Sequence, residues 1–181
     1  RAKFRFFLLQ KNGLPYAKEV EYAHSDGTAY IDSGIAPRRD LTAEFDTRLT
    51  AENGTYQNFF GAFGVDGNKK SNYGMCRYNK PGNASHNKWD REYATGSTYQ
   101  FVGNCVLDTD YHVVFKTTGL VVNGEEYGSN LSGNDFVESG WTINVFRNAK
   151  LGKQYDQTMA GYFKTFTLYT PKRRVRDYVP V

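Results

Sequence analysis

The residue types that bind sugars are concentrated between Tyr78 and Tyr93. This segment carries Trp89 and, beside it, the polar side chains of Arg91 and Asn83. Flat aromatic faces stack on the apolar side of a sugar ring, while amide and guanidinium groups hydrogen-bond to its hydroxyls. Because most of the residues between the two tyrosines are polar, we expect an exposed loop here. These five side chains are therefore candidate ligand-binding residues.

A second candidate is Tyr56 with Asn58, next to a turn marked by Gly54. An alternative interpretation applies to the longer segment. Trp89 folds back into the core, and the polar residues around it only solvate a hairpin. The residue types alone leave both interpretations open.

No spacing of nucleophiles, acids and bases indicates an enzyme. The histidines, His24, His86 and His112, are far apart, and none lies near a second metal-ligating residue at zinc-site spacing. Phosphate-binding, dinucleotide-binding and nucleophile-elbow motifs are absent. Cys76 and Cys105 fall in apolar stretches, where they form either a disulfide or two buried free thiols.

The elements that must position these residues are β-strands. Apolar residues recur with a period of two over 41–49, 111–117 and 141–145, which is typical of strands with one buried face. Both faces of 162–169 carry aromatic side chains, as in a strand that is covered on two sides. Asn123-Gly124, between two apolar runs, predicts a tight hairpin. We expect about ten to twelve short strands in two sheets, with little or no helix.

The composition agrees with an all-β domain. The 181 residues include 14 Tyr, 13 Phe and 2 Trp, or 16% aromatic, with 18 Gly and only 5 Pro. A net charge of +4 is too small to indicate a nucleic-acid-binding protein. No apolar run approaches the roughly 20 residues that span a bilayer.

Several stretches, taken in order, resemble the concanavalin A-like lectin/glucanase family, in the laminin-G-like form found in surface proteins of gut bacteria and their phages. These stretches are Val20–Tyr22 with Gly27–Gly34, Asn58–Ala62, Val122–Gly124, Ile143–Asn148, Gly161–Tyr169 and Val175–Pro180. The resemblance covers residues 19–181 and implies a jelly-roll sandwich of two antiparallel sheets, one of them concave. Residues 1–18 lie outside it, as an N-terminal arm or an added strand.

Glucanases of this family carry a strand motif E-x-D-x-E, which places three carboxylates on one face for a retaining mechanism. The nearest match here is Glu44, Asp46 and Arg48, with arginine where the acid/base glutamate would stand. Since the group that protonates the leaving oxygen is missing, the resemblance does not imply a glycoside hydrolase. We therefore expect a protein that is not an enzyme.

The same family also suggests a calcium ion, which many laminin-G-like domains hold with Asp and Asn oxygens. Asp66, Asn68, Asp108 and Asp110 are candidate ligands. Ordinary turn chemistry explains these residues equally well, and no other cofactor is expected.

These observations favour a non-catalytic binding module that recognises a glycan or a surface protein, displayed outside a cell, on its surface or on a virion. One alternative is an assembly or decoration domain in which residues 4–9 pack on a neighbouring chain. Another is a glycoside hydrolase of laminarinase-like architecture. The basic run 172–176 is interpreted as a solvated strand edge, so nucleic acid is not an expected partner.

Overall fold

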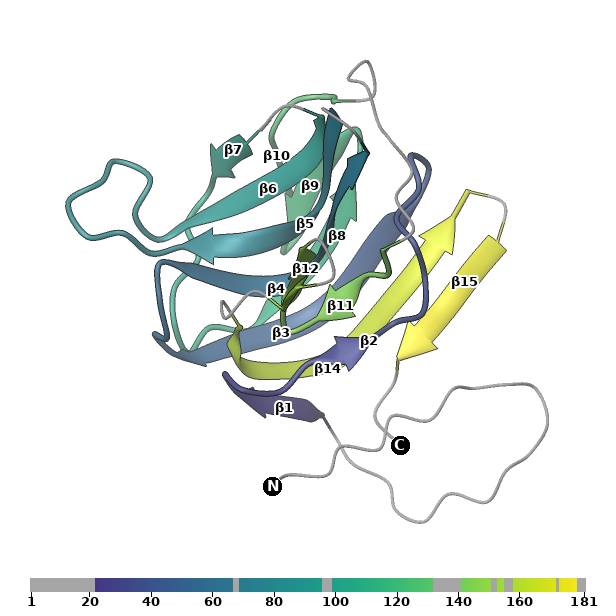
Figure 1. Ribbon diagram of the computed structural model, residues 1–181. Helices are drawn as coiled ribbons and strands as arrows, with labels where there is room; N and C mark the ends of the chain where they lie inside the picture. The colour runs from purple at the N-terminus through teal and green to yellow at the C-terminus, as the bar shows by residue number, and fades with distance from the viewer. Residues whose placement is uncertain are drawn as a thin grey trace, which may run out of the picture.

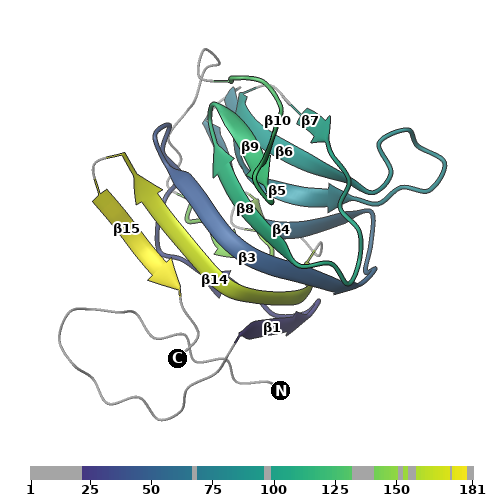
Figure 2. The ribbon, with the colours of Figure 1, turned by 180° about the vertical axis from the view of Figure 1, so that it is seen from behind.

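Two β-sheets pack face to face in the computed structural model of this protein (Figures 1 and 2). The structure describes residues 22–66, 69–95, 99–131, 141–150, 153–154, 158–171 and 173–178. The expected arm 1–18, including residues 4–9, lies outside the described residues. The strands are β1 (Ala23–Asp26), β2 (Ile31–Asp32), β3 (Thr42–Ala51), β4 (Tyr56–Asp66), β5 (Lys69–Tyr78), β6 (Lys88–Thr95), β7 (Tyr99–Val102), β8 (Tyr111–Lys116), β9 (Gly119–Val122), β10 (Glu125–Tyr127), β11 (Asn144–Val145), β12 (Asn148–Lys150), β13 (Lys153–Gln154), β14 (Ala160–Thr170) and β15 (Arg173–Tyr178).

The seven-strand sheet has the order β1-β14-β3-β8-β9-β10, and β15 also pairs with β14. The eight-strand sheet has the order β13-β12-β4-β5-β6-β7, and β11 joins β4 to β2. Neighbouring strands are antiparallel except β12 and β4, which run parallel. The described residues contain no helix. The expectation of an all-β jelly-roll sandwich is therefore confirmed.

Strand β3 shows how the period-two pattern builds this sandwich. Ala43, Phe45 and Leu49 are buried between the sheets, while Glu44 and Asp46 point to the outer face of the seven-strand sheet and are only half-buried. Phe45 lies at the centre of an aromatic core. Its ring contacts those of Phe59, Phe60, Phe163 and Phe166, with centroids 5.3 to 6.1 Å apart.

Strand β14 departs from the sequence-based expectation. Its two faces are not both covered, because a β-bulge between Phe163 and Thr165 shifts the register against β3. The bulge brings Phe163, Phe166 and Leu168 to the buried face and leaves Lys164 exposed. A bulge adds one residue to a strand, so the alternation changes phase at that point.

The predicted hairpin is confirmed between β9 and β10. Asn123 and Gly124 both have positive φ, 51° and 86°, and Glu125 pairs with Val122. Residues other than glycine, asparagine and aspartate rarely adopt two positive φ angles in succession.

Candidate functional site

Strand β6 carries three of the residues expected to bind a ligand, and it turns all three inward. Trp89, Arg91 and Tyr93 lie on the inner face of the eight-strand sheet, and Trp89 has only 1% of its surface exposed. The Trp89 ring packs on Phe59 and Tyr111, with centroids 5.0 and 4.9 Å away. A ring enclosed in this way has no free face for a sugar. Of the two interpretations that the sequence left open, the one in which Trp89 folds back into the core is confirmed, and the candidacy of Trp89 as a ligand-binding residue is wrong.

Trp89 is buried because the loop ends before it and strand β6 has already begun. Strand β6 begins at Lys88, and Trp89 pairs with Arg77 of β5. The exposed loop is therefore shorter than expected and covers residues 79–87, which project from the end of the sandwich (Figure 1). Of the candidate residues in the longer segment, only Asn83 is exposed on this loop.

The buried guanidinium group of Arg77 holds the loop at its base. The Arg77 guanidinium donates hydrogen bonds to Asn87 Oδ1 at 2.5 Å, Gln57 Oε1 at 2.5 Å and the Cys105 carbonyl at 2.9 Å. It also pairs with Glu52 at 2.9 Å, which lowers the pKa of that carboxyl. The loop therefore leaves the sheet in a defined direction.

The remaining candidates, Tyr56, Tyr78 and Asn58, lie on the outer face of the eight-strand sheet. Tyr78 pairs with Tyr56 of β4 and Asn58 with Cys76 of β5. Tyr78 and Asn58 are buried, whereas Tyr56 is half-buried.

Phe101 of β7 completes an aromatic row on this face that the sequence did not reveal. The ring of Tyr78 is 5.2 Å from that of Tyr56 and 5.0 Å from that of Phe101. Phe101 is 38% exposed, although a large apolar side chain on a strand is usually covered. The alternation of Gln100, Phe101 and Val102 was a signal for an outward ring, but only the pairing of Phe101 with Asp90 shows which face it shares. We call Tyr56, Tyr78 and Phe101 the aromatic row.

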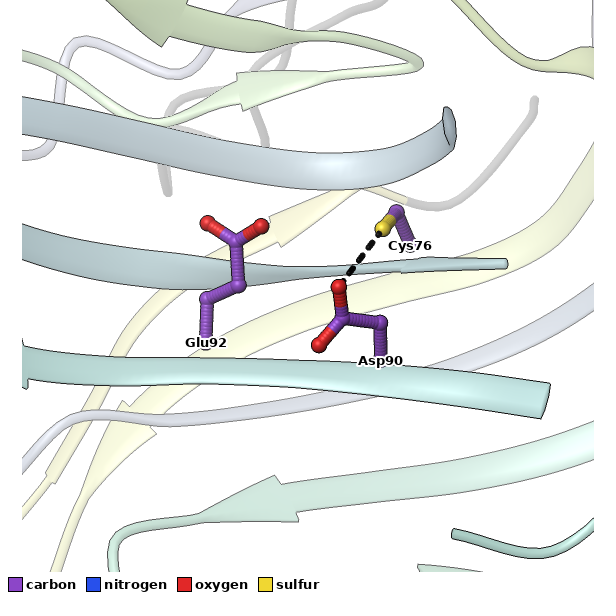
Figure 3. A group of neighbouring side chains, drawn as sticks. All are labelled: Cys76, Asp90 and Glu92. Atoms are coloured by element: carbon purple, nitrogen blue, oxygen red, sulfur yellow. Dashed lines mark hydrogen bonds between the residues drawn. The ribbon is translucent and has the colours of Figure 1, made fainter. Parts of the chain in front are cut away.

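A polar cluster lies beside the aromatic row. Cys76, Asp90 and Glu92 point to the outer face from β5 and β6, and their ligand-type atoms lie within 4.8 Å of one another (Figure 3). Burial, and then the charge of Glu92, raise the pKa of Asp90 to about 8. Burial also raises the pKa of the Cys76 thiol. At neutral pH Asp90 therefore keeps a proton that an exposed carboxylate would have lost.

The two cysteines are free and buried. Cys76 faces Asp90 on the outer side of its sheet, whereas Cys105 belongs to the hydrophobic core between the sheets. The open question of a disulfide is therefore answered in favour of two free thiols.

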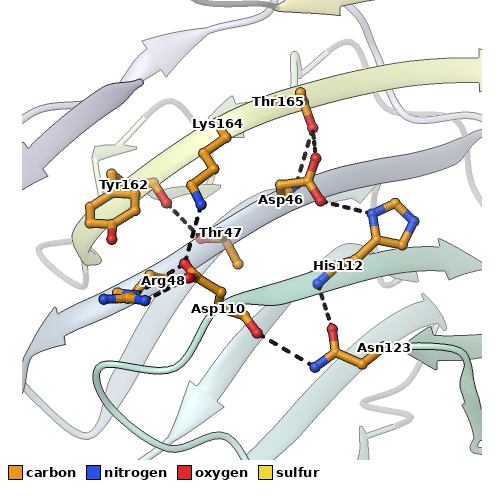
Figure 4. A network of polar contacts seen from close by, with 9 residues as sticks. All are labelled: Asp46, Thr47, Arg48, Asp110, His112, Asn123, Tyr162, Lys164 and Thr165. Atoms are coloured by element: carbon orange, nitrogen blue, oxygen red, sulfur yellow. Dashed lines mark hydrogen bonds and ion pairs between the residues drawn. The ribbon is translucent and has the colours of Figure 1, made fainter. Parts of the chain in front are cut away.

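The incomplete glucanase motif lies on the outer face of the other sheet (Figure 4). Asp46 accepts a hydrogen bond from Thr165 at 2.5 Å and lies 2.9 Å from His112 Nδ1. Arg48 forms a two-pronged ion pair with Asp110, at 2.5 and 3.1 Å. The arginine thus belongs to a surface network of ion pairs and hydrogen bonds.

Two of the candidate calcium ligands can be placed. The Asp110 carboxylate is engaged by Arg48 and lies 3.6 Å from Lys164, and the hydrogen bond from Arg48 lowers its pKa. Asp108 lies in a turn with a positive φ of 54°. Asn68 and the side chain of Asp66 lie outside the described residues, so calcium binding stays a prediction.

Comparison with known proteins identifies a fold but no family. No protein-family profile and no curated protein matches the chain. Solved structures of Trypanosoma rangeli sialidase do match. One is a complex with sialic acid, with 18% identity and a TM-score of 0.52 over 75% of this chain. Another is a complex with 2,3-difluoro-KDN, with 16% identity, the same TM-score and the same coverage.

A T. rangeli sialidase mutant described as displaying trans-sialidase activity matches equally well, at 18% identity and a TM-score of 0.52. This chain covers only 21% of each of these sialidase chains. At such identities the likeness establishes the all-β fold alone. Within the residues that the structure describes, no helix is long and apolar enough to span a membrane.

Proposed function

We propose that this domain is a non-catalytic carbohydrate-binding module that takes a glycan on the aromatic row. The observation that carries the proposal is the line of rings across β4, β5 and β7, with Phe101 exposed at one end and Tyr56 half-buried at the other. Tyr78 is buried between them and fixes their spacing. A sugar ring can stack on such a platform at little entropic cost, because the aromatic side chains are already held in place.

Polar groups around the row suit a hydroxyl-rich ligand. Lys88 and Glu92 are half-buried on the neighbouring strand β6, and Asn83 is exposed on the adjoining loop. These side chains supply donors and acceptors at the edge of the rings. Both charge signs occur, which favours a neutral or zwitterionic sugar over a polyanion.

Two features support a non-catalytic role. Asp46 and Arg48 are engaged in the surface network, and the third carboxylate of the glucanase motif is absent. Asp90 has a raised pKa, as a general acid would, but no part of it reaches the surface. A fully buried carboxyl cannot protonate a glycosidic oxygen in a bound sugar.

The test is a glycan array followed by affinity measurements on the best ligand. Phe101→Ala should weaken binding at least about tenfold, which is about 1.4 kcal/mol. Tyr22→Ala is the matched control, since Tyr22 is 48% exposed and its ring contacts that of Tyr162 in the other sheet. Equal binding by the two variants, a silent array, or turnover of the bound glycan would contradict the proposal.

A further inference from the structure

The Cys76–Asp90–Glu92 cluster has the donor set of a metal site. Cys76 and Asp90 are direct partners across β5 and β6, and Glu92 is two residues further along β6 on the same face. One sulfur and two carboxyl groups therefore converge from two rigid, hydrogen-bonded strands (Figure 3). Sites built on strands hold their ligands more closely than sites built on loops.

The Asp90 carboxyl of this cluster is poorly satisfied by hydrogen bonds. Asp90 is 0% exposed, and its Oδ1 has no hydrogen-bond partner among the described residues. Its other oxygen, Oδ2, accepts a weak hydrogen bond from Cys76 Sγ and no second one from the part of the chain that the structure describes. A buried carboxyl oxygen without a partner is costly, and a bound cation would remove that cost.

Neighbouring arginines do not supply this positive charge. Arg77 and Arg91 flank the cluster in sequence, but alternation turns both to the inner face of the sheet. There Arg77 donates hydrogen bonds to Gln57, Asn87 and Cys105. Arg91 donates hydrogen bonds to Gln100, Thr117 and Ser129.

The distance between the Cys76 and Asp90 ligand atoms suits zinc. A Zn–S bond of about 2.3 Å and a Zn–O bond of about 2.1 Å at a tetrahedral angle place the sulfur and oxygen about 3.6 Å apart. The distance from Cys76 Sγ to Asp90 Oδ2 is 3.7 Å. A thiolate ligand selects zinc-type ions over calcium and magnesium, which prefer sites made only of oxygen.

We propose that Cys76, Asp90 and Glu92 bind one zinc-type divalent cation on the outer face of the eight-strand sheet. Glu92 is half-buried, whereas Cys76 and Asp90 are buried, so Glu92 is the member of the cluster with the most solvent contact. A thiol binds a metal ion as the thiolate, so binding releases the proton of Cys76 into solution. Glu92 belongs to both proposals, but Cys76 and Asp90 are buried and contribute nothing to the proposed glycan surface, so Cys76→Ser tests the metal site separately.

Titration of the full chain with Co²⁺, a spectroscopic substitute for zinc, tests the proposal. We expect one ion per chain and a sulfur-to-cobalt charge-transfer band in the near ultraviolet, reversed by added Zn²⁺. Cys76→Ser should abolish the band, and Asp90→Asn should weaken binding at least about tenfold. Cys105→Ser is the matched control and should leave both unchanged, because Cys105 lies in the core between the sheets.

Because substitution of a buried residue could impair folding, Glu92→Gln at the half-buried position is measured in parallel. It should also weaken binding about tenfold while the thermal unfolding temperature without metal stays unchanged. Binding without the charge-transfer band, equal affinity in the Cys76→Ser variant, or tighter binding of Ca²⁺ than of Zn²⁺ would overturn the proposal. So would the absence of saturable binding.

Discussion

The guanidinium of Arg91 in the eight-strand sheet donates a 2.6 Å hydrogen bond to the carbonyl oxygen of Thr117, in the turn between β8 and β9 of the other sheet. The same group also donates to the carbonyl oxygens of Lys116 and Ser129. Burial lowers the pKa of Arg91 to about 10, so it stays charged at neutral pH and is stabilised by peptide dipoles. One buried side chain thus connects the two layers of the sandwich.

Replacing this connection should destabilise the fold. Arg91→Met keeps much of the apolar stem but takes the donor away from the carbonyl groups of Lys116, Thr117 and Ser129. We expect a loss of about 2–4 kcal/mol in the free energy of unfolding, measured with urea. Arg38→Met, at an exposed residue paired with Asp40, should change it by less than about 1 kcal/mol. Similar losses in the two variants would contradict a structural role for Arg91.

Stability measurements should distinguish Trp89, which is buried, from Phe101, which is partly exposed. Trp89→Ala removes a ring from the core and should cost about 3–5 kcal/mol. Phe101→Ala removes a ring that is 38% exposed and should cost less than half as much. Thermal unfolding of both variants checks the order. A stable Trp89→Ala variant would place that ring outside the core.

Gly74→Ala should disturb the eight-strand sheet. An added Cβ would lie 2.7 Å from the Phe60 carbonyl oxygen and 2.9 Å from Gly61 Cα, so the backbone of β4 would have to move. We expect a destabilisation of about 1–3 kcal/mol in urea unfolding. Gly119→Ala is the matched control in the other sheet, because its Cβ would meet nothing closer than 3.5 Å. If the two variants unfold at the same urea concentration, the close approach at Gly74 is wrong.

Asp90 should make the metal-free protein less stable as the pH rises. Burial raises the pKa of Asp90 from 3.8 to about 8, so the folded state keeps a proton that the unfolded state loses. Its contribution to stability is complete below about pH 4 and is lost progressively up to about pH 8, by at most about 1.4 kcal/mol per pH unit. Asp90→Asn carries no such charge, and its advantage over the unmodified chain should grow across this window. Urea unfolding in the presence of a chelator measures it.

Asp110→Asn supplies a control of opposite sign. Arg48 lowers the pKa of Asp110, so this carboxylate contributes stability above its ordinary pKa and loses that contribution as the pH falls. The variant should therefore be less stable than the unmodified chain at pH 7 and equal to it in strong acid. If the two aspartate variants differed from the unmodified chain in the same way across the pH range, the pKa directions given for Asp90 and Asp110 would both be contradicted.

Local sequence patterns predicted the strands well where one face is buried. The alternation in 41–49 and the Asn123-Gly124 turn both appear as expected. The bulge in β14 was not predictable, because nothing near Phe163 in the sequence indicates where the alternation changes phase. The resulting faces follow from pairing with β3, more than a hundred residues earlier.

The candidate site was only partly predictable, for the same reason. Asp90, Arg91 and Glu92 have the composition of a loop, yet they form a strand whose middle residue points into the core. Arg91 is tolerated there because distant carbonyl groups accept its hydrogen bonds. Tyr56 and Tyr78 were identified from their types, whereas Phe101 joins them only through the register of β6 and β7.

The alternation of inward and outward residues on β6 also fixes the register of this strand. A slip of one residue against β5 would drive Asp90 and Glu92 into the space between the sheets and expel Trp89 and Tyr93 to solvent. Neighbouring registers of this strand are therefore strongly disfavoured. The polar residues that form the proposed metal site thus also ensure that β6 pairs correctly.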